Sequence, residues 1–177
     1  LGVDINIEDG YVIASVKSGL KGNYVFLGGS FGSSVLATAN VMCAATVAKG
    51  TTVIEFAACE PEIVDLANFL VKMGAKITGI GSPCLTICGV KKLSPAEHKI
   101  IPDRIETGTF LLAGAITRGN VTVEKCQPLH LGAFLERLGE TGVSIKSGRN
   151  FIAISGISRW KPVDVVTLAY PGFPTDL

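Results

Sequence analysis

The sequence predicts an α/β fold of repeated units that place their helices inside and their sheets outside. Residues 44–55 and 113–124 share one pattern in register: small residues with helical spacing, a basic residue, a glycine, and a β-rich run that ends in Glu55 or Glu124. The helix that opens each copy is apolar almost all round, which is typical of a helix buried on all sides. Such helices favour an arrangement with the sheets outside them.

The first helix of the first copy is predicted over residues 35–48. Ser34 precedes it and is a suitable N-cap, and Gly50 is the residue type that commonly follows the end of a helix. The β-rich run from Thr51 to Glu55 then predicts a strand.

An amphipathic second helix is predicted to start at Pro61, because proline is favoured at the first helical position. Strands are predicted after it, near Lys76–Ile80 and Leu85–Val90. The helix would bury one stripe of apolar residues, formed by Ile63, Leu66, Ala67, Leu70 and Met73.

The second copy repeats this order. Its first helix is apolar over residues 108–116, and its second helix has the same spacing at Leu131, Phe134, Leu135 and Leu138. Residues 142–145 then match the strand that begins after Gly74.

The register of the repeat also predicts that the chain is an internal fragment. Residues 1–5 match residues 73–77 and 141–145, where a second helix ends, and residues 174–177 fall where a further first helix would begin. A repeat unit cannot bury its apolar face without neighbours. A naturally short protein with ragged repeats remains the alternative.

Composition favours a folded protein that binds small molecules. Hydrophobic residues make up 47% and charged residues 18%, and the net charge of +1 offers no electrostatic case for nucleic acid or an acidic membrane surface. No signal peptide or spanning segment is evident, and the odd count of 5 cysteines favours reduced thiols. These features predict a cytoplasmic protein.

Two cysteines, Cys84 and Cys88, are spaced like a metal-binding pair but lie in a predicted strand. Four strand residues span about 13 Å, too far for two ligands of one zinc ion. We therefore expect no metal site there. His98 and His130 are expected to be solvated loop residues.

Three stretches carry a resemblance to a known family. They are residues 42–52 together with 60–70, residues 102–110 (PDRIETGTF) and residues 170–176 (YPGFPTD). They resemble UDP-N-acetylglucosamine 1-carboxyvinyltransferase, the UDP-N-acetylglucosamine enolpyruvyl transferase, and the similarity covers essentially the whole chain.

The resemblance implies an inside-out α/β fold of two similar domains with three units each. Residues 1–101 would form the C-terminal part of the first domain, and residues 102–177 the beginning of the second.

The resemblance also implies the chemistry. The family moves the enolpyruvyl group of phosphoenolpyruvate to the 3′-hydroxyl of UDP-N-acetylglucosamine, and the acid of its Pro-Thr-Asp motif, here Asp176, is assigned to that hydroxyl. Ser34 and Val35 match the loop that contacts the uridine and its phosphates. Gly32 and Leu36 depart from the pattern, which puts direct diphosphate contact in doubt. Helix capping is the alternative role for Ser34 and Asp176.

No cofactor is implied, and the expected partners are the two substrates and the missing parts of a parent chain. In the family the reactive Cys or Asp and the residues that contact phosphoenolpyruvate lie outside the stretch matched here, so the isolated chain is expected to be inactive. Two alternatives remain: a shikimate-pathway enolpyruvyl transferase, and a non-catalytic paralogue or split-chain binding module.

Overall fold

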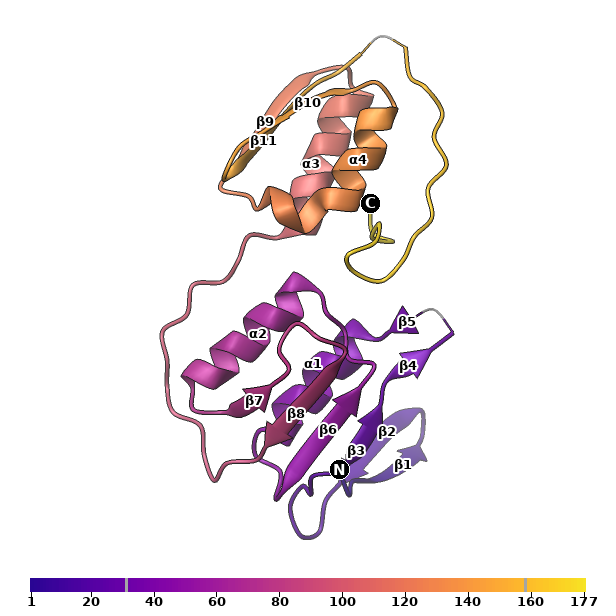
Figure 1. The fold of residues 1–177 in the computed structure, drawn as a ribbon. Coiled ribbons are helices and arrows are strands. Elements are labelled where there is room, and N and C mark those ends of the chain that lie inside the picture. The colour runs from indigo at the N-terminus through magenta and orange to yellow at the C-terminus, as the bar shows by residue number, and fades with distance from the viewer. Residues whose placement is uncertain (31, 158) are drawn as a thin grey trace. The chain divides into compact units, whose positions relative to one another are not determined.

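The computed structural model describes residues 1–30, 32–157 and 159–177. The chain divides into two compact units, unit 1 from Leu1 to Lys99 and unit 2 from Ile100 to Leu177 (Figure 1). Each unit is an α/β assembly, as predicted. That they belong to two larger domains remains a proposal. Within the described residues, no helix combines the length and the apolar character needed to cross a membrane.

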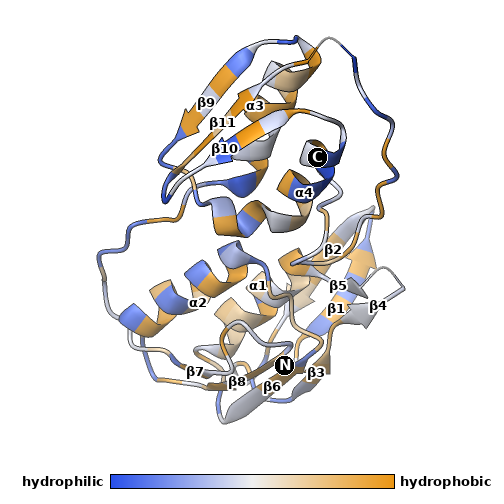
Figure 2. Cartoon of the chain, turned by 45° about the horizontal axis from the view of Figure 1, so that its top comes forward, coloured by the Kyte–Doolittle hydropathy of each residue, from blue (hydrophilic) through white to orange (hydrophobic). Residues whose placement is uncertain are grey.

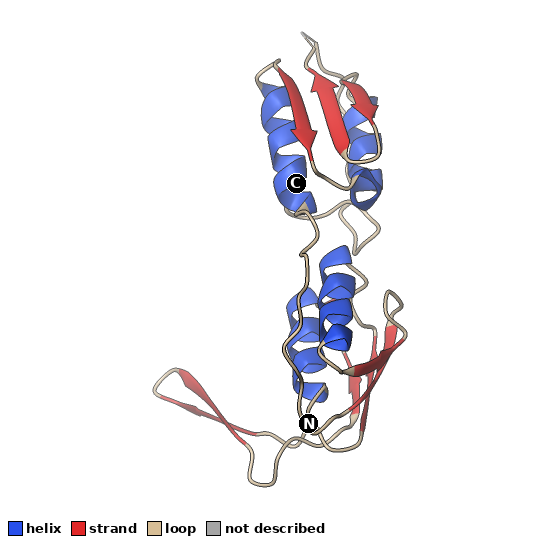
Figure 3. Ribbon diagram, turned by 90° about the vertical axis from the view of Figure 1, so that its left-hand side faces the viewer, coloured by secondary structure: helices blue, strands red, loops and turns tan. Residues whose placement is uncertain are grey.

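Unit 1 is built on one four-stranded sheet in the order β3-β6-β8-β7, in which only the β3–β6 pair is parallel. Two helices, α1 and α2, lie on one side of this sheet (Figure 3). The elements are β1 (Asp4–Glu8), β2 (Tyr11–Ser15), β3 (Tyr24–Phe26), β4 (Gly28–Gly29), β5 (Gly32–Ser33), α1 (Val35–Ala45), β6 (Thr51–Glu55), α2 (Pro61–Lys72), β7 (Lys76–Thr78) and β8 (Cys84–Cys88).

The sheet of unit 1 has one buried face and one solvent-exposed face. Ile54, Leu85 and Ile87 are at most 2% exposed and pack under the helices. Burying each contributes about 1.5–3 kcal/mol. On the opposite face Tyr24 and Phe26 are more than half exposed. The sheet therefore forms the outside of the unit, as predicted.

Unit 2 repeats this arrangement with a three-stranded antiparallel sheet in the order β10-β11-β9. Apolar and polar residues alternate along β9 (Figure 2). Leu111, Phe134 and Ile152 form the centre of its core. The elements are α3 (Arg104–Ile116), β9 (Asn120–Glu124), the 3-10 helix η1 (Pro128–Leu131), α4 (Gly132–Glu140), β10 (Ser144–Ser147) and β11 (Phe151–Ser155).

The predicted repeat is confirmed in the strand register. Thr51 pairs with Cys88 in unit 1, and Asn120 pairs with Ser155 at the matching position of unit 2. The backbone repeats as well, because Phe56 and Lys125 follow the matched strands with φ of 59° and 56°.

Two expectations about the first helices are wrong. Helix α1 ends at Ala45, well before Gly50, and Thr46 is its C-cap. The backbone N–H groups of Val47 and Ala48 donate to carbonyls three residues back, so a tighter turn replaces the α-helix there. The first helices are also not buried on all sides, since Leu36 is 76% and Ile116 75% exposed. One sheet and one second helix cover only one side of each.

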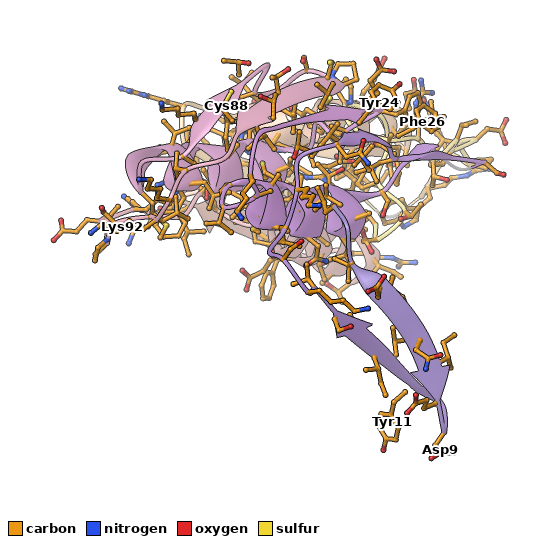
Figure 4. The ribbon with its side chains drawn as sticks, turned by 90° about the horizontal axis from the view of Figure 1, so that it is seen from below. Asp9, Tyr11, Tyr24, Phe26, Cys88 and Lys92 are labelled. Atoms are coloured by element: carbon orange, nitrogen blue, oxygen red, sulfur yellow. The ribbon has the colours of Figure 1, made fainter. Side chains whose placement is uncertain are left out.

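A hairpin formed by β1 and β2 extends from unit 1, with Asp9 and Tyr11 at its far end (Figure 4). Its pairing of Asp4 with Ser15 matches that of Lys76 with Cys88 in β7 and β8. Every residue of the two strands is exposed. The hairpin is thus a third copy of the repeat's last two strands.

Candidate functional site

The first candidate residue, Ser34, begins helix α1 as predicted. Its extended backbone (φ −95°, ψ 115°) turns the chain into the helix, and its hydroxyl oxygen accepts the backbone N–H of Ala37 at 3.2 Å. An accepting N-cap side chain satisfies one of the helix's unpaired donors. Ser34 is exposed, so its capping role leaves it accessible to a ligand.

A buried threonine fixes this helix start to the rest of unit 1. The hydroxyl of Thr38 donates to the carbonyl of Ser34 at 2.8 Å and accepts the backbone N–H of Ala58 at 3.0 Å. Thr38 is fully buried. It therefore ties the first turn of α1 to the segment between β6 and α2. This role of Thr38 was not predicted from the sequence, although a threonine inside an apolar helix is a signal for such a bond.

The neighbours of Ser34 differ in burial and in backbone conformation. Val35 is half-buried and packs against the core of unit 1. Leu36 projects into solvent. Before them, Gly32 has φ of 105° and pairs with Gly29 in the short β4–β5 hairpin. A side chain would be strained at that φ, which favours the glycine found there.

The matching position in unit 2 is Asp103, which caps α3. Its carboxylate accepts the backbone N–H groups of Ile105 at 2.8 Å and Glu106 at 3.1 Å. Thr107 donates to the carbonyl of Asp103 at 2.8 Å, as Thr38 does to Ser34. Both bonds go to Oδ1, and the negative charge of the carboxylate suits the positive end of the helix dipole. Asp103 is thus a structural cap.

The candidate acid Asp176 lies on a segment that is packed against α3 and α4. The ring of Phe173 lies 5.9 Å from that of Phe134, centre to centre. The guanidinium of Arg104 lies over the ring of Tyr170, and the side chain of Leu177 contacts the α-carbon face of Gly108 so closely that a Cβ there would collide with it. The stretches 102–110 and 170–176 therefore come together in unit 2.

Asp176 itself is exposed, in a turn formed by residues 174–177. Within the described residues, no hydrogen bond or ion pair engages its carboxylate. The structure thus brings Asp176 to the surface beside the start of α3, while Ser34 and Val35 lie at the start of α1 in unit 1.

Three of the five cysteines are not activated as nucleophiles. Burial raises the pKa of the Cys126 thiol above its ordinary value, and it does the same for Cys43 and Cys59. A raised pKa keeps a thiol protonated, and the thiolate is the reactive form. Cys84 and Cys88 are the two ends of strand β8, as predicted. In the described ranges, no three His, Cys, Asp or Glu side chains are grouped to hold a metal ion.

Both histidines are placed differently from the solvated loop positions expected for them. His98 is not solvated, because its ring Nε2 lies 2.9 Å from the carboxylate of Asp65 and its side chain is only 10% exposed. His130 lies in η1 and is half-buried. The burial of His98 could not be read from its polar, proline-containing surroundings.

Two curated relatives are about half identical to the chain. It is 49% identical to the UDP-N-acetylglucosamine 1-carboxyvinyltransferase of Koribacter versatilis and 51% identical to UDP-N-acetylglucosamine 1-carboxyvinyltransferase 1 of Caldanaerobacter subterraneus, in each case over all 177 residues. The chain spans 40% and 42% of the length of these relatives.

Solved structures share the fold. The enolpyruvyl transferase NikO from Streptomyces tendae superposes with a TM-score of 0.82 at 20% identity, covering 97% of this chain and 43% of that one. The EPSP synthase from Acinetobacter baumannii gives 0.60 at 19% identity, covering 87% and 37%. The family model described as EPSP synthase (3-phosphoshikimate 1-carboxyvinyltransferase) matches residues 1–177. The chain therefore belongs to this family of enolpyruvyl transferases.

Proposed function

We propose that this chain is part of an enzyme that transfers the enolpyruvyl group of phosphoenolpyruvate to the 3′-hydroxyl of UDP-N-acetylglucosamine. The new bond joins the sugar oxygen to C2 of the enolpyruvyl group, and phosphate leaves. The observation that supports this best is the identity of 49–51% along the whole chain to relatives named for that reaction. The structural neighbours, at 19–20% identity, support the fold alone.

Asp176 is proposed as the group that accepts the proton of the 3′-hydroxyl. A sugar hydroxyl is a poor nucleophile, so a base within hydrogen-bond reach assists its attack. An exposed carboxylate on a segment docked by Phe173 and Leu177 is held in position and remains accessible. That combination suits a base.

Ser34 and Val35 are proposed to contact the nucleotide. Backbone N–H groups at a helix start suit the oxygens of an anionic diphosphate. The bonds of Thr38 hold this start in one place, so the contact would be preorganised. Gly32 brings no charge, which makes the backbone rather than a side chain the source of the attraction.

The proposed setting follows from the reaction. It requires no cofactor and no nucleic acid or membrane partner, and the remaining parts of a longer parent chain would complete the site. The five free cysteines suit a reducing compartment, so we propose the cytoplasm. There the product would enter peptidoglycan synthesis, on which cell shape and division depend.

The choice of acceptor tests this proposal. The full-length protein containing this chain is incubated with phosphoenolpyruvate and either UDP-N-acetylglucosamine or shikimate 3-phosphate, and released phosphate is measured. We expect phosphate to be released when UDP-N-acetylglucosamine is the acceptor and not when shikimate 3-phosphate is. Release with shikimate 3-phosphate alone would overturn the proposal in favour of the shikimate-pathway enzyme, and none with either would favour a non-catalytic paralogue.

A further inference from the structure

The segment that joins the two units, residues 89–103, contains neither helix nor strand. Its first part is nonetheless tied to unit 1. The backbone N–H of Val90 donates to the carbonyl of Thr46 at 2.8 Å, and that of Ser94 donates to the carbonyl of Met73 at 2.8 Å. Leu93, between them, packs against the core of the unit. These bonds hold the segment as far as Ser94.

Further along the segment, the side chain of His98 provides another tie to unit 1. Its ring Nε2 lies 2.9 Å from Oδ1 of Asp65, and the two side chains are only 10% and 14% exposed. The same ring lies 5.2 Å from the ring of Phe69, centre to centre. Asp65 and Phe69 are one turn apart on α2, so the helix holds the imidazole by both its edge and its face.

The environment of the other ring nitrogen agrees with this arrangement. Nδ1 of His98 is buried, and within the described residues it has no hydrogen-bond partner. A ring that carries its proton on Nε2 donates it to Asp65 and leaves a bare lone pair at Nδ1. The opposite tautomer would set the lone pair of Nε2 against the carboxylate of Asp65 and would leave a buried N–H without an acceptor.

We propose that His98 is the terminal anchor of the connecting segment and that it confines the hinge between the units to residues 99–102. Beyond His98, Lys99 and Ile100 are exposed, and the next fixed residue is the helix cap Asp103. Hinges are a few loop residues that absorb a large change in backbone angles. Because Pro102 restricts Ile101 to extended conformations, the freest positions are 99 and 100.

Backbone relaxation of the 177-residue chain, labelled with ¹⁵N, tests this directly. In the natural sequence, the heteronuclear NOE should stay high through His98 and fall at residues 99–101. In His98→Ala and in the milder Asp65→Asn, the fall should begin just after Ser94. Equal mobility of residues 95–98 and 99–101 in the natural sequence would overturn the proposal.

Trypsin gives a second readout with an internal reference. Cleavage after Lys99 should become about tenfold faster in both variants, the change expected when a part-buried hydrogen bond to a carboxylate is lost. Cleavage after the exposed Lys17 should not change. Lys92, which also projects into solvent (Figure 4), lies before Ser94 and should be cleaved at its original rate.

Two control variants distinguish loss of the His98 anchor from a general loss of stability. Glu97→Ala alters an exposed neighbour, and Arg137→Ala removes the exposed pair with Glu140 in unit 2. Neither should change the relaxation of the segment. If His98→Ala unfolds unit 1, the relaxation and cleavage of the Asp65→Asn protein test the anchor instead. A folded Asp65→Asn protein with unchanged relaxation and cleavage would overturn the anchor.

Discussion

The guanidinium of Arg104 lies 5.5 Å from the ring centre of Tyr170, and this contact joins two distant stretches of the chain. Arg104 is the first residue of α3, and Tyr170 begins the run that ends at Asp176. A few residues on, Leu177 rests against Gly108 one turn into the same helix. The start of α3 thus positions the proposed base.

Gly108→Ala should disturb this position without unfolding the chain. The added methyl group would collide with the flexible end of Leu177, which can move. The better helix propensity of alanine, worth about 1 kcal/mol, would offset the lost packing. We expect the free energy of unfolding to change little and the activity of the full-length protein to fall by at least about tenfold, as misplacement of catalytic groups does.

The matched control is Gly132→Ala at the start of α4, where a Cβ would meet nothing within 4 Å. It should leave activity unchanged. Full activity of Gly108→Ala in the same assay would mean that the packing of Leu177 does not position Asp176.

Thr38→Val should destabilise unit 1 by about 1–3 kcal/mol, because the buried N–H of Ala58 would lose its acceptor. Thr38→Ser keeps the hydroxyl and should recover most of that loss. Urea denaturation of both variants measures the difference. An unchanged midpoint for Thr38→Val would show that the bridge from α1 to Ala58 contributes nothing.

Thr109→Val serves as the comparison for that experiment. The hydroxyl of Thr109 donates to the carbonyl of Ile105 in its own helix, and the residue is exposed. Its replacement should change the free energy of unfolding by less than about 0.5 kcal/mol.

Cys126 should make unit 2 less stable in alkali. Burial raises its pKa in the folded state, so above the ordinary thiol pKa the unfolded chain loses a proton that the folded chain keeps. The contribution of Cys126 to stability is therefore complete below the thiol pKa of the unfolded chain. It is lost as the pH rises through the thiol pKa of the folded chain. The free energy of unfolding should fall as the pH rises above the ordinary thiol pKa of about 8.5, with a smaller slope in Cys126→Ala. Identical slopes would contradict this.

The repeat was predictable because each copy obeys the same local rules. Ser34 at a helix start and Pro61 at the first helical position are short-range signals, and the structure confirms both. The end of α1 was not predictable, because no glycine or proline stands at residues 46–48, where a tighter turn replaces the helix. The full burial of α1 was predicted from composition, but neighbours decide burial.

The contacts around the candidate residues were harder to predict. The stretch 102–110 and the stretch 170–176 were each recognised, yet their contact through Arg104 and Tyr170 depends on how a segment without secondary structure packs. The same applies to His98, whose burial against α2 is a long-range contact.

The isolated chain should give no product. Transfer requires the groups that bind phosphoenolpyruvate to be held together with the base. Purified 177-residue protein, supplied with both substrates, should release no phosphate above the uncatalysed rate. Measurable turnover would mean that these residues are sufficient.

The most direct measurement is the turnover of the full-length protein carrying Asp176→Asn, compared with Asp164→Asn, which changes another exposed carboxylate of the same segment. With UDP-N-acetylglucosamine as acceptor, loss of a general base should lower kcat by about 100- to 10,000-fold. Asp164→Asn should keep its turnover. Undiminished kcat in Asp176→Asn would contradict the assignment of Asp176 as the base.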